Sequence, residues 1–391
     1  METSPAVPEP ARSAGSTREV VLTFLRLGVI AFGGPAAHIA LMREELVRRK
    51  QWVSDERFVD LMGATNLIPG PNSTELAIHL GHDRARWRGL VAAGVCFIVP
   101  AALMVGALAW AYVRYGRTPA VEGLLYGIVP VVLAIIVWAV VPLTRTAVKG
   151  WWGWLLALAA LGAYLAGVPE LLVLAAGAVA GALRHGAVDA ATRWRTQGPG
   201  ALAFPLVAPV IAGRPGSEDL TTLFWTILKI GSVLYGSGYV LLAFLEGDFV
   251  DRLGWLTQQQ LLDAVSIGQV TPGPVFTTAT FVGYLVAGFW GAVLATVAIF
   301  LPSFVFVGLL TRLTGWLRSR AWTSSLLDAV NAVSLALMVG VALQLARGAL
   351  TDVLTVTLLA AGLVALWRTR LNSAWLIGGG AVVGVVHQFA G

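Results

Sequence analysis

Two Pro-Gly-Pro motifs interrupt apolar, helix-compatible runs of this chain, one in NLIPGPNSTE (residues 66–75) and one in QVTPGPVFTT (residues 269–278). Proline removes a backbone donor and disfavours helix in the residue before it, and glycine relaxes the backbone. Each run should therefore break into two half-helices. The second proline of each motif, Pro71 or Pro274, suits the first position of the new half-helix, where its missing N–H costs nothing. Both places are thus predicted to present a helix N-terminus with free N–H groups.

The composition puts these breaks in a membrane protein. Hydrophobic residues make up 57% of the 391 residues and charged residues only 12%, which is too little charge to cover a soluble globule. The basic residues are scattered over short loops, so nucleic acid is not expected as a partner. The lone Cys96 lies in an apolar run, which excludes a disulfide framework. We expect no metal and no cofactor.

The chain is an internal duplication. A shift of 203 residues carries Arg26 onto Lys229 and Pro69 onto Pro272, and it holds without a gap as far as Trp87. Beyond that point the shift falls to 202, because Arg88 has no counterpart. The predicted organisation is a disordered tail (1–18), an N-terminal transmembrane repeat (19–184), a linker (185–218) with a candidate short crossing at 201–212, and a C-terminal transmembrane repeat (219–391).

The charges of equivalent loops predict that the two copies face opposite ways. Loop 43–50 holds four basic residues, whereas its counterpart 246–253 holds one basic residue among three acidic ones. Conversely, loop 312–320 is more basic than its counterpart 114–117. Basic loops stay cytoplasmic, so the simplest interpretation is an inverted repeat. The predicted fold is an all-α polytopic membrane protein whose helices break at the Gly-Gly-Pro and Pro-Gly-Pro motifs.

Matched breaks in two halves are the feature that marks a substrate site in many transporters. A tetrahedral oxyanion needs N–H donors and positive potential, and a half-helix N-terminus offers both through its amides and its dipole. The alternative is a pair of structural kinks whose backbone groups are satisfied by neighbouring helices. The residues expected to contact the anion are Gly33, Gly34, Asn66, Pro69, Gly70, Pro71, Asn72 and Ser73 in the first copy, and Gly236, Ser237, Gln269, Pro272, Gly273, Pro274 and Thr277 in the second.

Arg26 and Lys229 are the only basic residues inside their spans, and they occupy equivalent positions. A cation is costly in lipid, so it should face the protein interior or a cavity, where a dianion is a natural partner. Two alternatives stay open. The side chains could snorkel toward a nearby surface, or they could form salt bridges with Asp60 and Asp263.

Glu75 and His79 lie one helical turn apart and share a face of the half-helix after the first break. In the ungapped register the second copy has Thr278 and Val282 at these positions. Such an asymmetric titratable pair suits proton coupling, because histidine changes charge near neutral pH. The alternative is a helix-face hydrogen bond near the cytoplasmic mouth. His38 ranks below this pair as a functional residue.

The segments FLRLGVIAFGGP (24–35) and NLIPGPNS, together with KIGSVLYGSGYV (229–240) and QVTPGPV, resemble the chromate ion transporter family in its long two-domain form, from about Val20 onward. The resemblance implies an inner-membrane secondary transporter that exports chromate and confers chromate resistance on bacteria, with sulfate as the structural mimic. Alternatives are a transporter of sulfate or another inorganic anion, and an anion channel. With no nucleotide-binding fingerprint, nucleophile triad or metal cluster in the sequence, an ATP-driven pump is disfavoured and an enzyme is least expected. A homodimer stays open.

Overall fold

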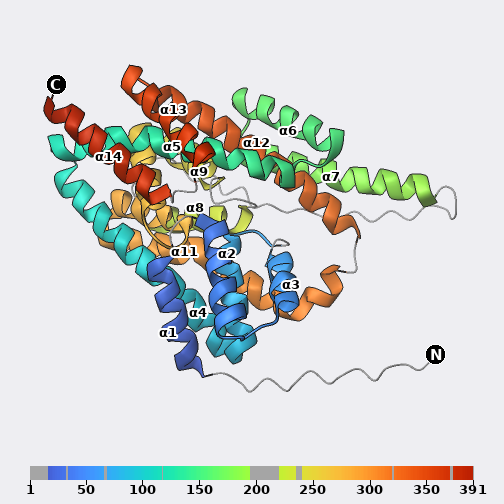
Figure 1. Cartoon of the computed structure of the whole chain (residues 1–391). Coiled ribbons are helices and arrows are strands. Elements are labelled where there is room, and N and C mark those ends of the chain that lie inside the picture. The colour runs from blue at the N-terminus through green and yellow to red at the C-terminus, as the bar shows by residue number, and fades with distance from the viewer. Residues whose placement is uncertain are drawn as a thin grey trace.

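The computed structural model describes residues 16–31, 34–65, 68–116, 118–193, 220–234, 240–318, 321–369 and 373–390, and every regular element in these ranges is a helix (Figure 1). The first copy comprises α1 (Thr17–Ile30), α2 (Gly34–Met42), the π-helix η1 (Arg43–Arg49), α3 (Asp55–Thr65), α4 (Asn72–Tyr115), α5 (Pro119–Ala147), α6 (Gly150–Leu165) and α7 (Glu170–Arg193). The second comprises α8 (Leu220–Val233), α9 (Leu241–Leu245), the π-helix η2 (Glu246–Arg252), α10 (Gln258–Val270), the 3₁₀ turn η3 (Val275–Thr277), α11 (Thr278–Arg318), α12 (Ala321–Ala349), α13 (Val353–Arg368) and α14 (Ser373–Ala390).

The helix breaks fall at the Pro-Gly-Pro motifs. In the first copy α3 ends at Thr65 and α4 begins at Asn72, and in the second α10 ends at Val270 before the η3 turn. Pro71 and Pro274 stand one position earlier than predicted, as N-caps. Their ψ angles of 95° and 130° are extended, so the first helical residue is the one that follows each proline.

Both α4 and α11 fold back on themselves as hairpins. A straight helix of 44 residues, the length of α4, would reach about 66 Å, twice the hydrocarbon thickness of a bilayer. The backbone leaves the helix at Ala85–Arg86 in α4 and at Ala287–Gly288 in α11. Around the first turn a Cβ on Gly81 would overlap the carbonyl oxygen of Gly89, eight residues later. Residues 72–84 are therefore a short limb packed antiparallel against a long limb, 87–115, and α11 repeats this arrangement.

The matched hairpins correct the register of the two copies. Ala85 corresponds to Ala287, so the shift is already 202 before Trp87, and the extra residue of the first copy lies between Pro71 and Gly81. The second copy begins this limb with a 3₁₀ turn, whose three residues at about 2.0 Å each cover the length of four α-helical residues at about 1.5 Å. Glu75 and His79 therefore correspond to Thr277 and Phe281, and the predicted partners Thr278 and Val282 are wrong by one residue.

The long limbs of α4 and α11 pack against each other in opposite directions. A Cβ on Gly308 would lie 3.2 Å from the Trp87 ring, and a Cβ on Gly94 would overlap the Phe304 ring. Residues further along α4 therefore contact residues nearer the N-terminus of α11, so the two limbs run antiparallel. Equivalent helices that run antiparallel relate the two halves by a two-fold axis perpendicular to them, which makes the fold an inverted repeat.

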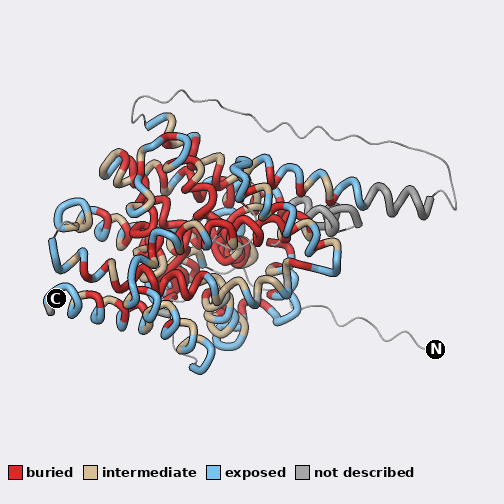
Figure 2. The backbone as a smooth tube through the Cα atoms, turned by 90° about the horizontal axis from the view of Figure 1, so that it is seen from above, coloured by how far each residue is buried: buried red, intermediate tan, exposed pale blue. Residues whose placement is uncertain are grey.

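The outer helices surround this central pair. In the described part of the chain four helices are long and apolar enough to cross a membrane, namely α4, α5, α11 and α12, and α6, α8, α13 and α14 are shorter apolar helices. The outer helices of each copy pack against those of the other copy. α5 of the first copy packs with α13 and α14, and α12 of the second packs with α6 and α7 (Figure 1). Buried residues gather in the middle and exposed ones at the periphery (Figure 2). Large apolar side chains such as Leu103, Trp151 and Trp375 are exposed, as expected of a lipid-facing surface.

Replacing Arg86 by glycine should stabilise the hairpin turn of α4. Arg86 has φ 51° and ψ −141°, a region that costs an L-residue about 1–3 kcal/mol, and the second copy carries Gly288 there. Because Arg86→Ala removes the same charge but keeps the strain, the comparison isolates the backbone. We expect Arg86→Gly to exceed Arg86→Ala in free energy of unfolding by about 1 kcal/mol, measured in detergent. Equal stabilities would contradict the turn geometry.

The inverted repeat predicts that equivalent loop positions open to opposite sides of the membrane. Arg48 of η1 and Asp251 of η2 are equivalent and both exposed. After Cys96 is replaced by serine, Arg48→Cys should react with an impermeant maleimide only from the cytoplasmic side, because its loop is basic. Asp251→Cys should react only from the other side. Labelling of both cysteines from one side would exclude the inversion.

Candidate functional site

Each Pro-Gly-Pro break is closed by a backbone hydrogen bond from the other half of the molecule. The Gly70 N–H donates to the carbonyl oxygen of Leu234 at 2.8 Å, and the Gly273 N–H donates to that of Ala31, also at 2.8 Å. Ala31 and Leu234 are equivalent residues at the ends of α1 and α8. The exchange is reciprocal, as a two-fold relation requires. Both glycines have positive φ, 134° and 90°, which a residue with a side chain rarely adopts.

These bonds correct one part of the predicted anion site. Gly70 and Gly273 were expected to contact the anion, but their amides already donate to carbonyl oxygens of the other half of the protein. In the first turn of α4 the amides of Thr74 and Glu75 donate to the Pro71 carbonyl. At the glycines the break is thus a structural junction, and any substrate contact depends on what lies beside it.

A buried polar cluster follows the first break. We call it the first-break cluster, and each member exposes at most 3% of its surface: His38, Ser73, Thr74, Glu75, His79 and Ser303. The Ser303 hydroxyl donates to Glu75 Oε1 at 3.4 Å, while Oε2 accepts no hydrogen bond within the described part of the protein. A Cβ on Gly70 would overlap Glu75 Oε1. The break glycine and this carboxyl group therefore pack directly together.

His38 connects the cluster to the second break. Its Nε2 lies 3.0 Å from the Ala31 carbonyl oxygen, and its Nδ1 lies 3.2 Å from Ser73 Oγ. A carbonyl oxygen only accepts, so Nε2 carries the hydrogen and Nδ1 accepts from the Ser73 hydroxyl. The same Ala31 oxygen accepts the Gly273 N–H. His38 thus ranks higher than the sequence indicated, and the signal for it was the replacement of a histidine by Leu241 in the second copy.

The second break is closed by the equivalent backbone hydrogen bond, but the positions equivalent to the first-break cluster carry no titratable side chain. Leu241, Val275, Thr277, Phe281 and Ala101 stand at the second break where His38, Ser73, Glu75, His79 and Ser303 stand at the first. The Thr277 hydroxyl, expected to bind the anion, donates to the Pro274 carbonyl in its own turn at 2.8 Å. The titratable chemistry of the breaks therefore belongs to the first copy.

Arg26 and Lys229 form equivalent ion pairs with the π-helices. Arg26 Nη1 lies 3.7 Å from Glu45 Oε1, and Lys229 Nζ lies 2.6 Å from Asp248 Oδ2. The expected partner Asp263 instead accepts the Tyr112 hydroxyl at 2.7 Å. The Arg26 side chain is 62% exposed, so it does not line an enclosed cavity. The salt-bridge alternative thus applies, but with different carboxylates from those predicted.

The other predicted residues lie beside the breaks or outside the described ranges. Gly34 begins α2, Asn72 begins α4, Pro69 and Pro272 flank the break glycines, and Gln269 near the end of α10 has a buried Nε2 without a hydrogen-bond partner in the described structure. Gly33, Asn66, Gly236 and Ser237 fall outside the described residues, as does the candidate crossing 201–212.

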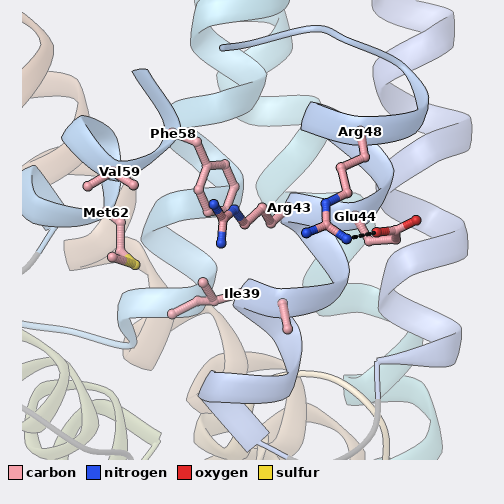
Figure 3. Close-up of a pocket in the computed structure, with 8 residues that line it drawn as sticks. Ile39, Arg43, Glu44, Arg48, Phe58, Val59 and Met62 are labelled. Atoms are coloured by element: carbon pink, nitrogen blue, oxygen red, sulfur yellow. Dashed lines mark hydrogen bonds and ion pairs between the residues drawn. The ribbon is translucent and has the colours of Figure 1, made fainter. Parts of the chain in front are cut away.

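A pocket of about 480 Å³ opens between α2, η1 and α3 (Figure 3). Its lining is Ile39, Ala40, Phe58, Val59 and Met62 with the charged residues Arg43, Glu44 and Arg48. Arg43 binds Asp55 through two 2.7 Å hydrogen bonds, which hold the pKa of Asp55 below its ordinary value. Arg48 pairs with Glu44 at 3.3 Å. The pocket thus joins an apolar wall to the basic loop of the first copy.

Comparison with known proteins identifies the family. The model of the chromate transporter family matches residues 18–182 and again residues 221–385. The chain belongs to the chromate transporter family. It is 34% identical to a chromate transport protein of Cupriavidus metallidurans, covering 94% of this chain and 92% of that one. It is 33% identical to a chromate transport protein of Pseudomonas aeruginosa (95% and 91%) and 31% identical to a probable chromate transport protein of Synechococcus elongatus (95% and 96%). No solved structure matches it.

Family membership and fold agree on the protein's setting. The double match makes the two halves homologous, and the long apolar helices make the chain a multi-pass protein of the inner membrane. The family is one of transporters.

Removing the two equivalent cations should have unequal effects on stability. Asp248 is 7% exposed, and Lys229→Ala leaves it with Arg252 alone, so we expect a loss of about 2–4 kcal/mol in free energy of unfolding. Arg26→Ala breaks a long pair whose arginine is 62% exposed and leaves Glu45 with Arg49, so it should cost less than about 1 kcal/mol. Thermal unfolding of both purified variants tests this. Losses of the same size would show that the pairs are energetically equivalent.

Proposed function

We propose that this protein exports chromate across the inner membrane as a proton-coupled secondary transporter and thereby confers chromate resistance. The observation that carries the proposal is the buried carboxyl group of Glu75, beside the break of one copy only, with an oxygen that has no donor among the described residues. A fully buried carboxylate without a cation is expensive, and a proton removes that cost. Glu75 is accordingly the proton carrier in this proposal.

The groups around Glu75 suit a tetrahedral oxyanion. Thr74 Oγ1 is buried and has no hydrogen-bond partner in the described structure, so its hydroxyl is available to donate to a bound anion. Ser73 and Ser303 place two further hydroxyls beside Glu75, which in this structure donate to His38 Nδ1 and Glu75 Oε1, and the positive end of the α4 dipole lies at the same place. These features support the first-break cluster as the chromate site, with the backbone of the break holding α4 in position.

Electrostatics sets the direction of coupling. At an effective dielectric near 20, two unit charges 4 Å apart interact by about 4 kcal/mol, and a dianion beside an ionised Glu75 would be repelled by roughly twice that. Chromate therefore binds when Glu75 is protonated, and ionisation of Glu75 favours its release. A proton and chromate that move together carry one net negative charge.

The membrane potential then favours export. One negative charge leaving an inside-negative cell gains about 2.3 kcal/mol per 100 mV, whereas a proton leaving against one pH unit costs about 1.4 kcal/mol. At a potential of about 100 mV and a gradient of about one pH unit, the membrane potential contributes more to the free energy of export than the pH gradient opposes. Chromate export by this route needs no nucleotide.

Glu75→Gln should make chromate transport insensitive to pH while chromate binding survives, because glutamine mimics the protonated carboxyl group. The measurement is chromate flux in everted vesicles and proteoliposomes, with pH, voltage and sulfate varied independently. The matched control is His79→Phe, which installs the residue of the second copy, Phe281, and should keep the pH response.

If the pH response persists in folded Glu75→Gln protein but disappears in His79→Phe, His79 is the proton carrier instead of Glu75. If the pH response persists in both variants, neither residue takes part in the coupling. Sulfate that moves as fast as chromate would assign the site to tetrahedral dianions in general.

A further inference from the structure

The π-helix η2 of the second copy carries an acidic residue where η1 carries the cation Arg43, which lines the pocket of the first copy. Glu246 stands at the position of Arg43, and Gln258 at that of Asp55. Gln258 Nε2 donates to Glu246 Oε1 at 3.4 Å, as Arg43 donates to Asp55 in the first copy. The contact is the same in both copies, but the residue on the π-helix changes from a cation to an acid.

Glu246 is buried and incompletely hydrogen-bonded. It is 4% exposed, and its Oε2 accepts no hydrogen bond from the described residues. A second carboxyl group reaches the same place from the first copy, because a Cβ on Gly247 would lie 2.6 Å from Cδ of Glu170, at the start of α7. The glycine next to Glu246 therefore makes room for Glu170, so an acidic side chain of the first half packs against η2 at the residue beside Glu246.

The neighbouring charges do not neutralise this pair. Lys229 and Arg252 are the cations of the cluster, and both bind Asp248, at 2.6 Å and 2.9 Å. Asp251 adds a further negative charge at the surface. From α6, Tyr164 faces Glu246 and Glu170, and its hydroxyl donates to Gln344 of α12 at 2.5 Å. Burial and then the charges of Asp251 and Glu170 raise the pKa of Glu246, which lies outside the candidate membrane spans, to about 7.

We propose that Glu170 and Glu246 form a proton-binding site that holds one proton between the two carboxyl groups near neutral pH. The unsatisfied Oε2 is where such a proton removes the cost of a buried, unpaired charge. In the described part of the chain no group of three or more His, Cys, Asp or Glu side chains converges as a metal site would require, so the ligand is a proton.

The inverted repeat gives this site a location and an effect. It lies on the face opposite the basic loop of η1, where exported anion would leave. When the pair ionises, the exit becomes more negative and return of the anion is disfavoured. This effect rests on the proposed export, whereas the proton site itself does not.

The pH dependence of stability tests the site without any transport assay. A carboxyl group whose pKa is raised binds more protons in the folded protein than in the unfolded one, so stability falls as pH rises from about 4.5 to 7 and then levels off. We expect the melting temperature of the wild type to follow this course in detergent. Glu246→Gln and Glu170→Gln should each reduce the slope between pH 4.5 and 7, while the buried Glu75 keeps its own contribution. Glu44→Gln, an exposed acid at the position equivalent to Gly247, should leave it unchanged.

A wild-type pH slope in folded Glu246→Gln and Glu170→Gln proteins would overturn the proposal, and either variant suffices if the other does not fold. Repeating the titration in Glu75→Gln separates the two proton sites. The slope should persist there even though transport has lost its pH response. A slope that disappears with Glu75→Gln alone would assign the proton to the first-break cluster instead.

Discussion

Two backbone hydrogen bonds, from Gly70 to Leu234 and from Gly273 to Ala31, hold the two halves of this protein together at its centre. Each pairs the glycine of one helix break with the carbonyl oxygen of the residue that follows the first helix of the other half. A break at membrane depth is tolerated only when its polar backbone groups find partners, and here each half supplies the partner for the other. The broken helices are thus stable only as a matched pair.

Because the backbone is satisfied by symmetry, the side chains around it are free to differ. The first copy surrounds its break with His38, Ser73 and Glu75, and the second has Leu241, Val275 and Thr277 in their places. Such an arrangement separates the structural requirement from the chemical one. A single titratable acid beside one break can couple transport to protons without a second, equivalent acid competing for the same proton.

The sequence predicted the duplication, the breaks and the inversion, because proline, glycine and arginine act through local backbone and charge rules. It could not predict the partners of those breaks. The Leu234 carbonyl is an ordinary backbone group, and only the reciprocal packing brings it to Gly70. The one-residue register error came from a 3₁₀ turn with no sequence mark of its own. Lys229 likewise pairs with Asp248 and not with the predicted Asp263, because the π-helix η2 brings the Asp248 carboxylate against α8.

The charge reversal between Arg43 and Glu246 shows how an inverted repeat can give direction to a symmetric frame. Inversion places equivalent positions on opposite sides of the membrane. A cation at Arg43 and an acid at Glu246 therefore give the electrostatic potential opposite signs at the two ends of the transport path. In the proposed export of chromate, a basic mouth concentrates the dianion on the entry side, and an acidic mouth lowers its concentration on the exit side. The field acts on encounter and leaves the central site unchanged. Directional preference can therefore evolve at the surface while the paired breaks, which both halves need to fold, remain intact.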